Sequence, residues 1–328
     1  MKKIIIISLL LLTSLSFSQS GAGKFLFYRK VKVLNNISGK SEITFSVTDT
    51  NNNEIYSIKK LESNKEEIPN LYLFNNGASV VTGILDGKIE IYDSLGILKN
   101  TVYPFRNYPF KYERSILIDI SGNYCAAIAS QQDMNELLVL ILSSNGKVIN
   151  TFNINKPYFN SLKFSEEMNL LAVSVYDWNR NKLKRNTVFY NLQGDKELIV
   201  HDSFGGAKFY PKLKLFLGFD KNSFFVADLQ NKNLVIENRL SGNLLINDAD
   251  LSGNKLYLAA SQKPLLKNGK WFYNNLAMET INLVTGKQTG IPVKLKPFTT
   301  LKIIKRKSAL YIKTGSSEVK IPVNSLGK

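Results

Sequence analysis

Short apolar runs separated by polar turns recur along this chain, and residues 115–154 show the pattern most clearly. Read with the two-residue period of a strand, this stretch contains four apolar runs, each ended by a turn signal. The runs are Ser115–Ile120, Cys125–Ser130, Leu137–Leu142 and Val148–Ile154. Asn145-Gly146 lies between the last two runs and favours a type I′ hairpin, in which both central residues have positive φ. The stretch therefore predicts a four-stranded antiparallel unit of about forty residues.

The second hairpin of this unit recurs along the chain as an apolar strand, a polar turn and another strand. Successive copies are 38 to 54 residues apart, measured between the turn residues Asn52, Gly96, Gly146, Gly194, Lys232 and Gly286. A period in the forties with four strands per period is what a propeller blade requires. We expect complete units at about 70–103, 115–154, 160–201, 206–239 and 245–294, and about three strands in each of 24–60 and 299–324.

The first hairpin of three units also shares a pattern, an apolar strand, a Ser-led turn and a strand that ends in small residues. The three stretches are DISGNYCAAIAS (119–130), KFSEEMNLLAVS (163–174) and DLSGNKLYLAAS (250–261). They resemble the S-x-x-G-x-x-L-A-x-x-S inner hairpin of the WD40-like and YVTN-like β-propeller families, and IYDSLGILKN (91–100) is similar to the end of a WD-type third strand. The Gly-His half of the WD signature is absent, and no motif indicates one enzymatic subfamily.

This resemblance implies an all-β fold, a single β-propeller domain over residues 24–324. It implies six or seven four-stranded blades, with the ring closed by N-terminal and C-terminal strands that share a blade.

The first eighteen residues have the features of a signal peptide. Met1-Lys2-Lys3 is a positive start, Ile4–Leu12 is an apolar run too short to span a bilayer, and Ser16-Phe17-Ser18 offers small residues for cleavage. We therefore expect cleavage before Gln19 and an exported protein, either periplasmic or secreted.

Composition and motifs indicate a globular protein with little catalytic equipment. The chain has 328 residues, of which 44% are hydrophobic and 21% charged. Its only cysteine, Cys125, excludes an intramolecular disulfide, and its only histidine, His201, excludes a metal site with two His ligands. Walker A, G-x-S-x-G and paired-Cys motifs are absent from the sequence. We therefore expect a protein that is not an enzyme and carries no cofactor or metal.

Three aspartates keep an enzymatic alternative open. Asp119, Asp248 and Asp250 fall on predicted innermost strands, which line the channel of a propeller. If they converged there with a basic residue, they would suit a hydrolase or lyase acting on sugars or lactones, or would bind a cation. Capping of the Ser-Gly turns that follow is the plainer interpretation.

Aromatic and basic residues gather in segments that the predicted blades place on one face. Two long loops, 177–186 and 262–275, hold the chain's only Trp residues beside Lys and Arg, and the inter-blade connections 104–114 and 155–159 add more. Aromatic rings stack on sugars and anchor protein interfaces, while Lys and Arg attract anionic groups. Packing between blades is the alternative explanation. The predicted binding residues are Phe105, Arg106, Tyr108, Lys111, Tyr112, Tyr158, Trp178, Arg180, Lys184, Arg185, Lys270, Trp271 and Tyr273.

The charge is unevenly distributed. Residues 253–328 carry fourteen Lys and Arg against the acids Glu279 and Glu318, so they hold +12 of the net charge of +17. A basic segment on an exported protein predicts an anionic partner, and a Lys-rich composition that keeps the surface soluble is the alternative. We expect a monomeric binding or scaffold protein for a protein partner or an anionic polysaccharide. Contact with an anionic membrane surface is a further expected interaction, and nucleic acid is not an expected partner.

Overall fold

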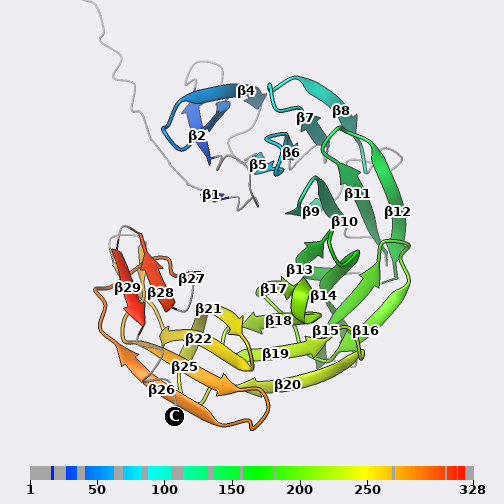
Figure 1. The fold of residues 1–328 in the computed structure, drawn as a ribbon. Coiled ribbons are helices and arrows are strands. Elements are labelled where there is room, and N and C mark those ends of the chain that lie inside the picture. Colours follow the sequence, from blue (N-terminus) through cyan, green and yellow to red (C-terminus); the bar gives the residue numbers. More distant parts are fainter. Residues whose placement is uncertain are drawn as a thin grey trace, which may run out of the picture. The chain divides into compact units, whose positions relative to one another are not determined.

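The structure is a computed structural model, and the part of the chain that it describes consists of β-strands, one short 3-10 helix and turns (Figure 1). The described residues are 16–17, 27–34, 41–62, 69–82, 88–104, 114–131, 136–155, 158–179, 182–267, 270–306, 309–315 and 317–321. Within these ranges, no helix has the length and apolar character needed to cross a membrane. The chain divides into two compact units, residues 1–172 with 190–195, and residues 173–189 with 196–328.

The first unit contains three antiparallel sheets of four strands each. The first has the order β1 (Ser16–Phe17), β2 (Phe27–Leu34), β3 (Ser41–Thr48) and β4 (Glu54–Glu62). The second has the order β5 (Asn70–Leu73), β6 (Ser79–Thr82), β7 (Ile89–Tyr92) and β8 (Leu98–Val102). The third consists of β9 (Arg114–Ser121), β10 (Tyr124–Gln131), β11 (Leu137–Ser143) and β12 (Val148–Ile154).

The fourth sheet contains the division between the units, and the remaining sheets belong to the second unit. The fourth has β13 (Tyr158–Ser165), β14 (Leu170–Asn179), β15 (Lys182–Asn191) and β16 (Lys196–Val200). The fifth has β17 (Gly206–Tyr210), β18 (Leu215–Asp220), β19 (Ser223–Asp228) and β20 (Asn233–Arg239), with the 3-10 helix η1 (Pro211–Leu213) between its first two strands.

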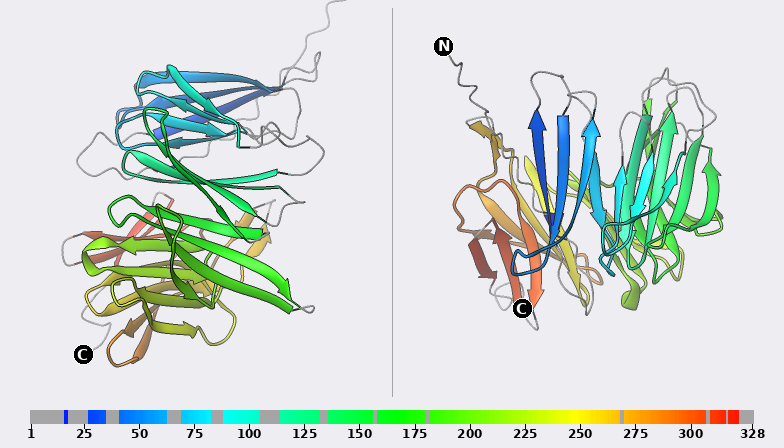
Figure 2. Two further views of the ribbon diagram at one scale, coloured as in Figure 1. Left: turned by 90° about the vertical axis from the view of Figure 1, so that its right-hand side faces the viewer. Right: turned by 90° about the horizontal axis from the view of Figure 1, so that it is seen from above.

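The sixth sheet has β21 (Leu244–Ser252), β22 (Lys255–Gln262), β25 (Leu276–Asn282) and β26 (Gln288–Val293). The seventh has β27 (Lys302–Arg306), β28 (Ala309–Thr314) and β29 (Ser317–Ile321). A separate pair, β23 (Leu265–Lys267) and β24 (Lys270–Phe272), lies in the chain between β22 and β25. Both views in Figure 2 show the strands of each sheet running alongside one another.

These sheets confirm the predicted four-strand repeat. The unit predicted at 115–154 is observed at 114–154, and the other four complete units begin and end within about two residues of the predicted limits. The C-terminal segment forms three strands, as predicted, and 24–60 also supplies three. Among the described residues the seventh sheet contains only β27, β28 and β29, so closure by a shared terminal blade stays a prediction.

The turn at Asn145-Gly146 differs from the predicted type I′ hairpin. Gly146 has a φ of 88°, but Asn145 does not have positive φ, and Gly146 N donates to Ser143 O at 3.0 Å. The turn therefore resembles a type I turn followed by a left-handed glycine, and the register shift between Ile141 and Leu142 is the accompanying bulge. A loop of this kind requires positive φ at one residue only, whereas a type I′ turn requires it at two, so the type I′ prediction is wrong.

The same turn occurs in four successive sheets, and a side chain at its first position holds it. The starting residues are Asp49, Asp93, Ser143 and Asn191. At Asp93, for example, Oδ1 accepts hydrogen bonds from the backbone N–H of Leu95 and of Ile97, both at 2.9 Å. A short polar side chain here satisfies turn N–H groups that have no strand partner, so the sequence signal for the turn is the residue three before the left-handed position, which is Asn52 in the first sheet and Gly in the other three.

The core of each unit lies between the faces of successive sheets. In the first unit, buried side chains of β6 and β7 pack against those of β10 and β11, and Val80, Ile91 and Cys125 are completely buried. In the second unit, the rings of Phe216 and Phe189 pack edge to face, with their centroids 4.9 Å apart. The middle strand β7 is buried on both faces, whereas the fourth strand β20 of the fifth sheet is mostly exposed. Packing of a sheet between two neighbours thus explains why a middle strand such as β7 has buried residues at every position.

Outer strands of the first unit are attached to the turn of the next sheet by asparagine side chains. Asn100 Nδ2 on β8 donates to Gly146 O at 2.6 Å, and Asn150 Nδ2 on β12 donates to Leu192 O. Beside the second contact, the ring of Phe152 lies against Gly194. These repeated contacts join each sheet to its successor at the outer edge, where few apolar side chains are buried.

Candidate binding site and its surroundings

The first predicted loop is a β-hairpin. Residues 177–186 were expected to form a long loop, but β14 extends to Asn179 and β15 begins at Lys182, so the loop prediction is wrong for most of this segment. In β15, Leu183, Lys184 and Arg185 are exposed, whereas Asn186 through Tyr190 are buried. The exposed end of the hairpin therefore extends beyond the packed core. Trp178 lies in β14, and Arg180 lies outside the described residues.

The second predicted loop, 262–275, contains the β23–β24 hairpin, so the loop prediction is wrong here too. Leu265 pairs with Phe272, Leu266 with Trp271, and Lys267 with Lys270. Leu265 is 63% exposed, Leu266 59% and Trp271 55%. Since directly opposed residues lie on the same face of a two-stranded ribbon, both faces of this hairpin carry exposed apolar side chains.

Tyr273 fixes the base of the β23–β24 hairpin. Its backbone forms a bridge with Phe298, through hydrogen bonds of 2.8 and 3.1 Å, and the two rings stack with centroids 5.7 Å apart. Gln262 N also donates to Asn274 O at 3.3 Å. Tyr273, predicted as a binding residue, therefore packs on Phe298 and positions the hairpin.

Of the remaining predicted binding residues, only Tyr158 and Lys270 lie within the described part of the chain. Tyr158 is the first residue of β13 and is exposed, while Lys270 lies in β24. The other members lie outside the described residues; they are Phe105, Arg106, Tyr108, Lys111 and Tyr112. The common aromatic and basic face stays a prediction.

Asp119 has structural partners. Its Oδ2 accepts the backbone N–H of Phe164 on β13 at 2.7 Å, and its Oδ1 lies 3.0 Å from Lys163 Nζ. The carboxylate of Asp119 thus connects the first strand of the third sheet to the first strand of the fourth sheet.

Asp248 and Asp250 converge on Lys208, with Oδ1 of Asp248 at 3.2 Å and Oδ2 of Asp250 at 3.7 Å from its Nζ. Asp248 Oδ2 also accepts the backbone N–H of Ile303 on β27 at 2.7 Å. Asp250 Oδ1 accepts the hydroxyl of Tyr210 at 2.5 Å, and burial together with this carboxylate raises the pKa of Tyr210 well above its usual range.

Lys208, the Ile303 N–H and the Tyr210 hydroxyl therefore share the oxygens of these two aspartates, and the network joins β17, β21 and β27. In the described part of the chain, no group of three His, Cys, Asp or Glu side chains is arranged to hold a metal ion. The carboxylates considered for catalysis or cation binding thus make contacts that join successive sheets.

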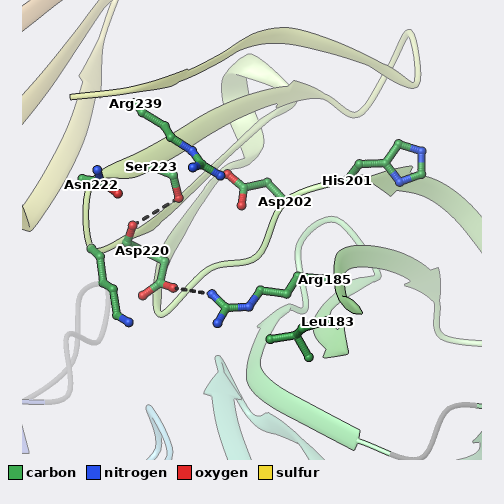
Figure 3. Close-up of a pocket in the computed structure, with 9 residues that line it drawn as sticks. Leu183, Arg185, His201, Asp202, Asp220, Asn222, Ser223 and Arg239 are labelled. Carbon is green, nitrogen blue, oxygen red and sulfur yellow. Dashed lines mark hydrogen bonds and ion pairs between the residues drawn. The ribbon is translucent and has the colours of Figure 1, made fainter. Parts of the chain in front are cut away.

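A cavity of about 430 Å³ opens beside the exposed end of β15, within the second unit (Figure 3). It is lined by Leu183, Arg185, His201, Asp202, Asp220, Lys221, Asn222, Ser223 and Arg239, and we call it the Arg239 pocket. Arg185 was among the predicted binding residues, but the other lining residues were not. They come from four separate segments, and no motif in the sequence connects them.

The polar groups of the Arg239 pocket are only partly neutralised. Arg185 Nη1 lies 3.7 Å from Asp220 Oδ2, whereas Lys221 and Arg239 form no ion pair with any described residue. In Figure 3 the side chain of Arg239 points toward Asp202, and the ring of His201 points away from the other lining residues. His201 Nδ1 lies 2.9 Å from Asn186 Oδ1, so this histidine has a structural hydrogen bond.

Comparison with solved structures identifies the class of fold as a β-propeller. The β-propeller domain of the trilobed protease from Pyrococcus furiosus, which has an open velcro topology, is similar with a TM-score of 0.51 and 13% identity. The match covers 94% of this chain and 97% of that one. A chain of the mitotic checkpoint complex has a TM-score of 0.54 at 8% identity. That match covers 98% of this chain and 94% of that one.

Sqt1 from Chaetomium thermophilum has a TM-score of 0.56 at 10% identity, covering 92% of this chain and 80% of that one. No protein-family model matches the sequence, and no curated protein matches it. Identities this low define the fold and leave the function to be argued from the sites.

Proposed function

We propose that this protein is an exported, non-catalytic β-propeller that binds a protein partner through the β23–β24 hairpin. The observation that carries the proposal is the exposure of Leu265, Leu266 and Trp271 on a hairpin that no further described strand extends. Exposed apolar side chains gathered in one place are typical of interaction sites, and Trp is among the residues that most often dominate binding energy.

The charge around the hairpin favours a partner with acidic residues. Residues 251–278 include four lysines and no aspartate or glutamate. Two of these lysines, Lys267 and Lys270, are directly opposed in the hairpin. An apolar hairpin within a basic stretch of sequence suits a protein whose own apolar contact is flanked by Asp or Glu.

The fold supports a scaffold role in a general way. One similar chain is part of a crystal structure of the mitotic checkpoint complex, which is a protein assembly. The enzymatic alternative gains no support from Asp119, Asp248 and Asp250, because backbone N–H groups, lysines and Tyr210 occupy their oxygens.

Export is proposed from the N-terminal sequence. Cleavage before Gln19 would remove β1, whose Ser16 and Phe17 pair with Tyr28 and Phe27, and would leave β2, β3 and β4 as the first sheet. N-terminal sequencing of the protein recovered from the cell envelope or medium should therefore start at or near Gln19. Recovery there of protein that retains Met1 would contradict the export signal.

The binding proposal is tested by cross-linking from the hairpin. A photo-reactive amino acid at Leu266 should form a protein adduct in cells that produce the protein naturally. The same residue placed at Val284, which is 75% exposed on a turn of the sixth sheet, provides the control. Adducts that depend on position 266 and disappear with Leu265→Ser plus Trp271→Ala support the proposal.

The double substitution should leave the fold intact, since neither side chain is buried. An unchanged melting temperature would verify this. Equal adducts from positions 266 and 284, or adducts that contain saccharide and no protein, would refute a protein partner at this hairpin.

A further inference from the structure

We infer that the Arg239 pocket is a second binding site, and that its ligand is an acidic sugar, a polyhydroxylated ring with a single anionic group such as a uronic acid. The volume of about 430 Å³ lies within the range of small-ligand sites. This site is separate from the β23–β24 hairpin and does not depend on the proposed protein partner.

The cationic part of the pocket would hold the anionic group of the ligand. Lys221 and Arg239 line the cavity and form no ion pair with any described residue. A guanidinium presents its N–H groups in a fork that matches the two oxygens of a carboxylate. These two side chains can therefore bind a carboxylate without first breaking an ion pair with a described residue.

Backbone hydrogen bonds hold the turn that carries Lys221 in place. Lys221 has a φ of 47° in the turn between β18 and β19. Its carbonyl accepts the N–H of Ile246 at 2.5 Å, and the carbonyl of Asn222 accepts the N–H of Leu240 at 2.7 Å. Because the chain leading to the next sheet fixes both carbonyls, the turn is positioned before any ligand arrives, and less ordering is required for binding.

The rest of the lining suits hydroxyl groups better than a second charge. Asp202 and Asp220 would repel a polyanion, but carboxylates accept hydrogen bonds from sugar hydroxyls. Asn222 and Ser223 add hydrogen-bond donors and acceptors, and Leu183 adds an apolar surface for the C–H face of a sugar ring. A ligand with one carboxylate and several hydroxyls uses all of these groups, whereas a bare oxyanion uses only the cations.

The test measures binding of glucuronate, glucose and sulfate to the intact protein by isothermal titration calorimetry. Glucuronate should bind saturably, and glucose and sulfate should each bind more weakly. Arg239→Gln should weaken glucuronate binding at least about tenfold, since a hydrogen bond to a charged group is lost. Arg306→Gln is the matched control, because Arg306 lies on β27, where it pairs with Glu318.

Both Arg variants should keep the melting temperature of the parent to within a few degrees. The hairpin variant Leu265→Ser plus Trp271→Ala should bind glucuronate normally, which separates this site from the protein-binding site. Absence of saturable glucuronate binding to the parent protein, or equal binding to the Arg239→Gln and Arg306→Gln variants, would overturn the assignment. Sulfate binding as tight as glucuronate binding would overturn the sugar and leave only an anion site.

Discussion

Replacing Gly194 by Ala should destabilise the protein far more than the same change at Gly286. Both glycines have positive φ, 93° and 69°, and both lie in the turn between the last two strands of a sheet. A methyl group on Gly286 would meet nothing within 4 Å. A methyl group on Gly194 would lie 2.7 Å from Cγ and 2.9 Å from Cβ of Phe152.

The expected losses of stability follow from two effects, the positive φ at both glycines and the steric clash with Phe152 at Gly194. Positive φ disfavours Ala by about 1 kcal/mol or somewhat more, and this term should be the whole effect at Gly286. At Gly194 an overpacking term of about 1–3 kcal/mol is added. The clash involves atoms next to the backbone of Phe152, so a side-chain rotation cannot relieve it and β12 itself has to shift. We therefore expect a total of about 2–4 kcal/mol at Gly194.

Chemical denaturation followed by circular dichroism measures the loss of unfolding free energy in each of the two glycine variants. A double-mutant cycle with Phe152→Ala identifies the source, because removing the ring and Cγ should reduce the penalty of Gly194→Ala by about 1 kcal/mol or more. Equal penalties at Gly194 and Gly286, or a penalty at Gly194 that is unchanged in the Phe152→Ala background, would refute the steric argument.

Two further predictions concern buried polar groups. Asp248→Ala should reduce the free energy of unfolding by about 2–4 kcal/mol and Asp248→Asn by less, because Ala leaves the Ile303 N–H without its acceptor. Loss of hydrogen-exchange protection at the Ile303 amide would verify this, and retained protection would contradict it. Burial raises the pKa of Tyr56 to about 12, so the unfolded state, with a pKa near 10, ionises first as the pH rises. The contribution of Tyr56 to the free energy of unfolding is therefore complete below pH 10, and roughly 2–3 kcal/mol of it is lost between about pH 10 and 12. Tyr56→Phe should remove this part of the decline in stability at alkaline pH. Parallel curves of stability against pH for the two proteins would disprove it.

The sheets were predictable because each depends on local pairing. Alternation and turn residues gave the four strands of 114–154 almost to the residue, since every strand of that sheet pairs with a neighbour in the chain. The β23–β24 hairpin was missed although Asn268-Gly269 is the same turn signal as Asn145-Gly146. Its strands are three residues long and exposed, so no run of buried residues marked them.

The sites were less predictable because their geometry comes from packing between sheets. The partners of Asp119 are 44 and 45 residues away, and those of Asp248 include Ile303, 55 residues away. Nothing in the local sequence distinguishes such an aspartate from a catalytic one. The Arg239 pocket similarly combines the ends of strands from two sheets, and only Arg185 had been selected as a binding residue from the sequence.

The asparagine contacts from Asn100 and Asn150 have a consequence for cooperativity. Each links one sheet only to the sheet that follows, and the buried faces are shared in the same way. The free energy of such an array is close to a sum of sheet terms and nearest-neighbour terms. A substitution at one outer turn should therefore loosen the two sheets that meet there first, and its effect should decline with each further sheet along the first unit.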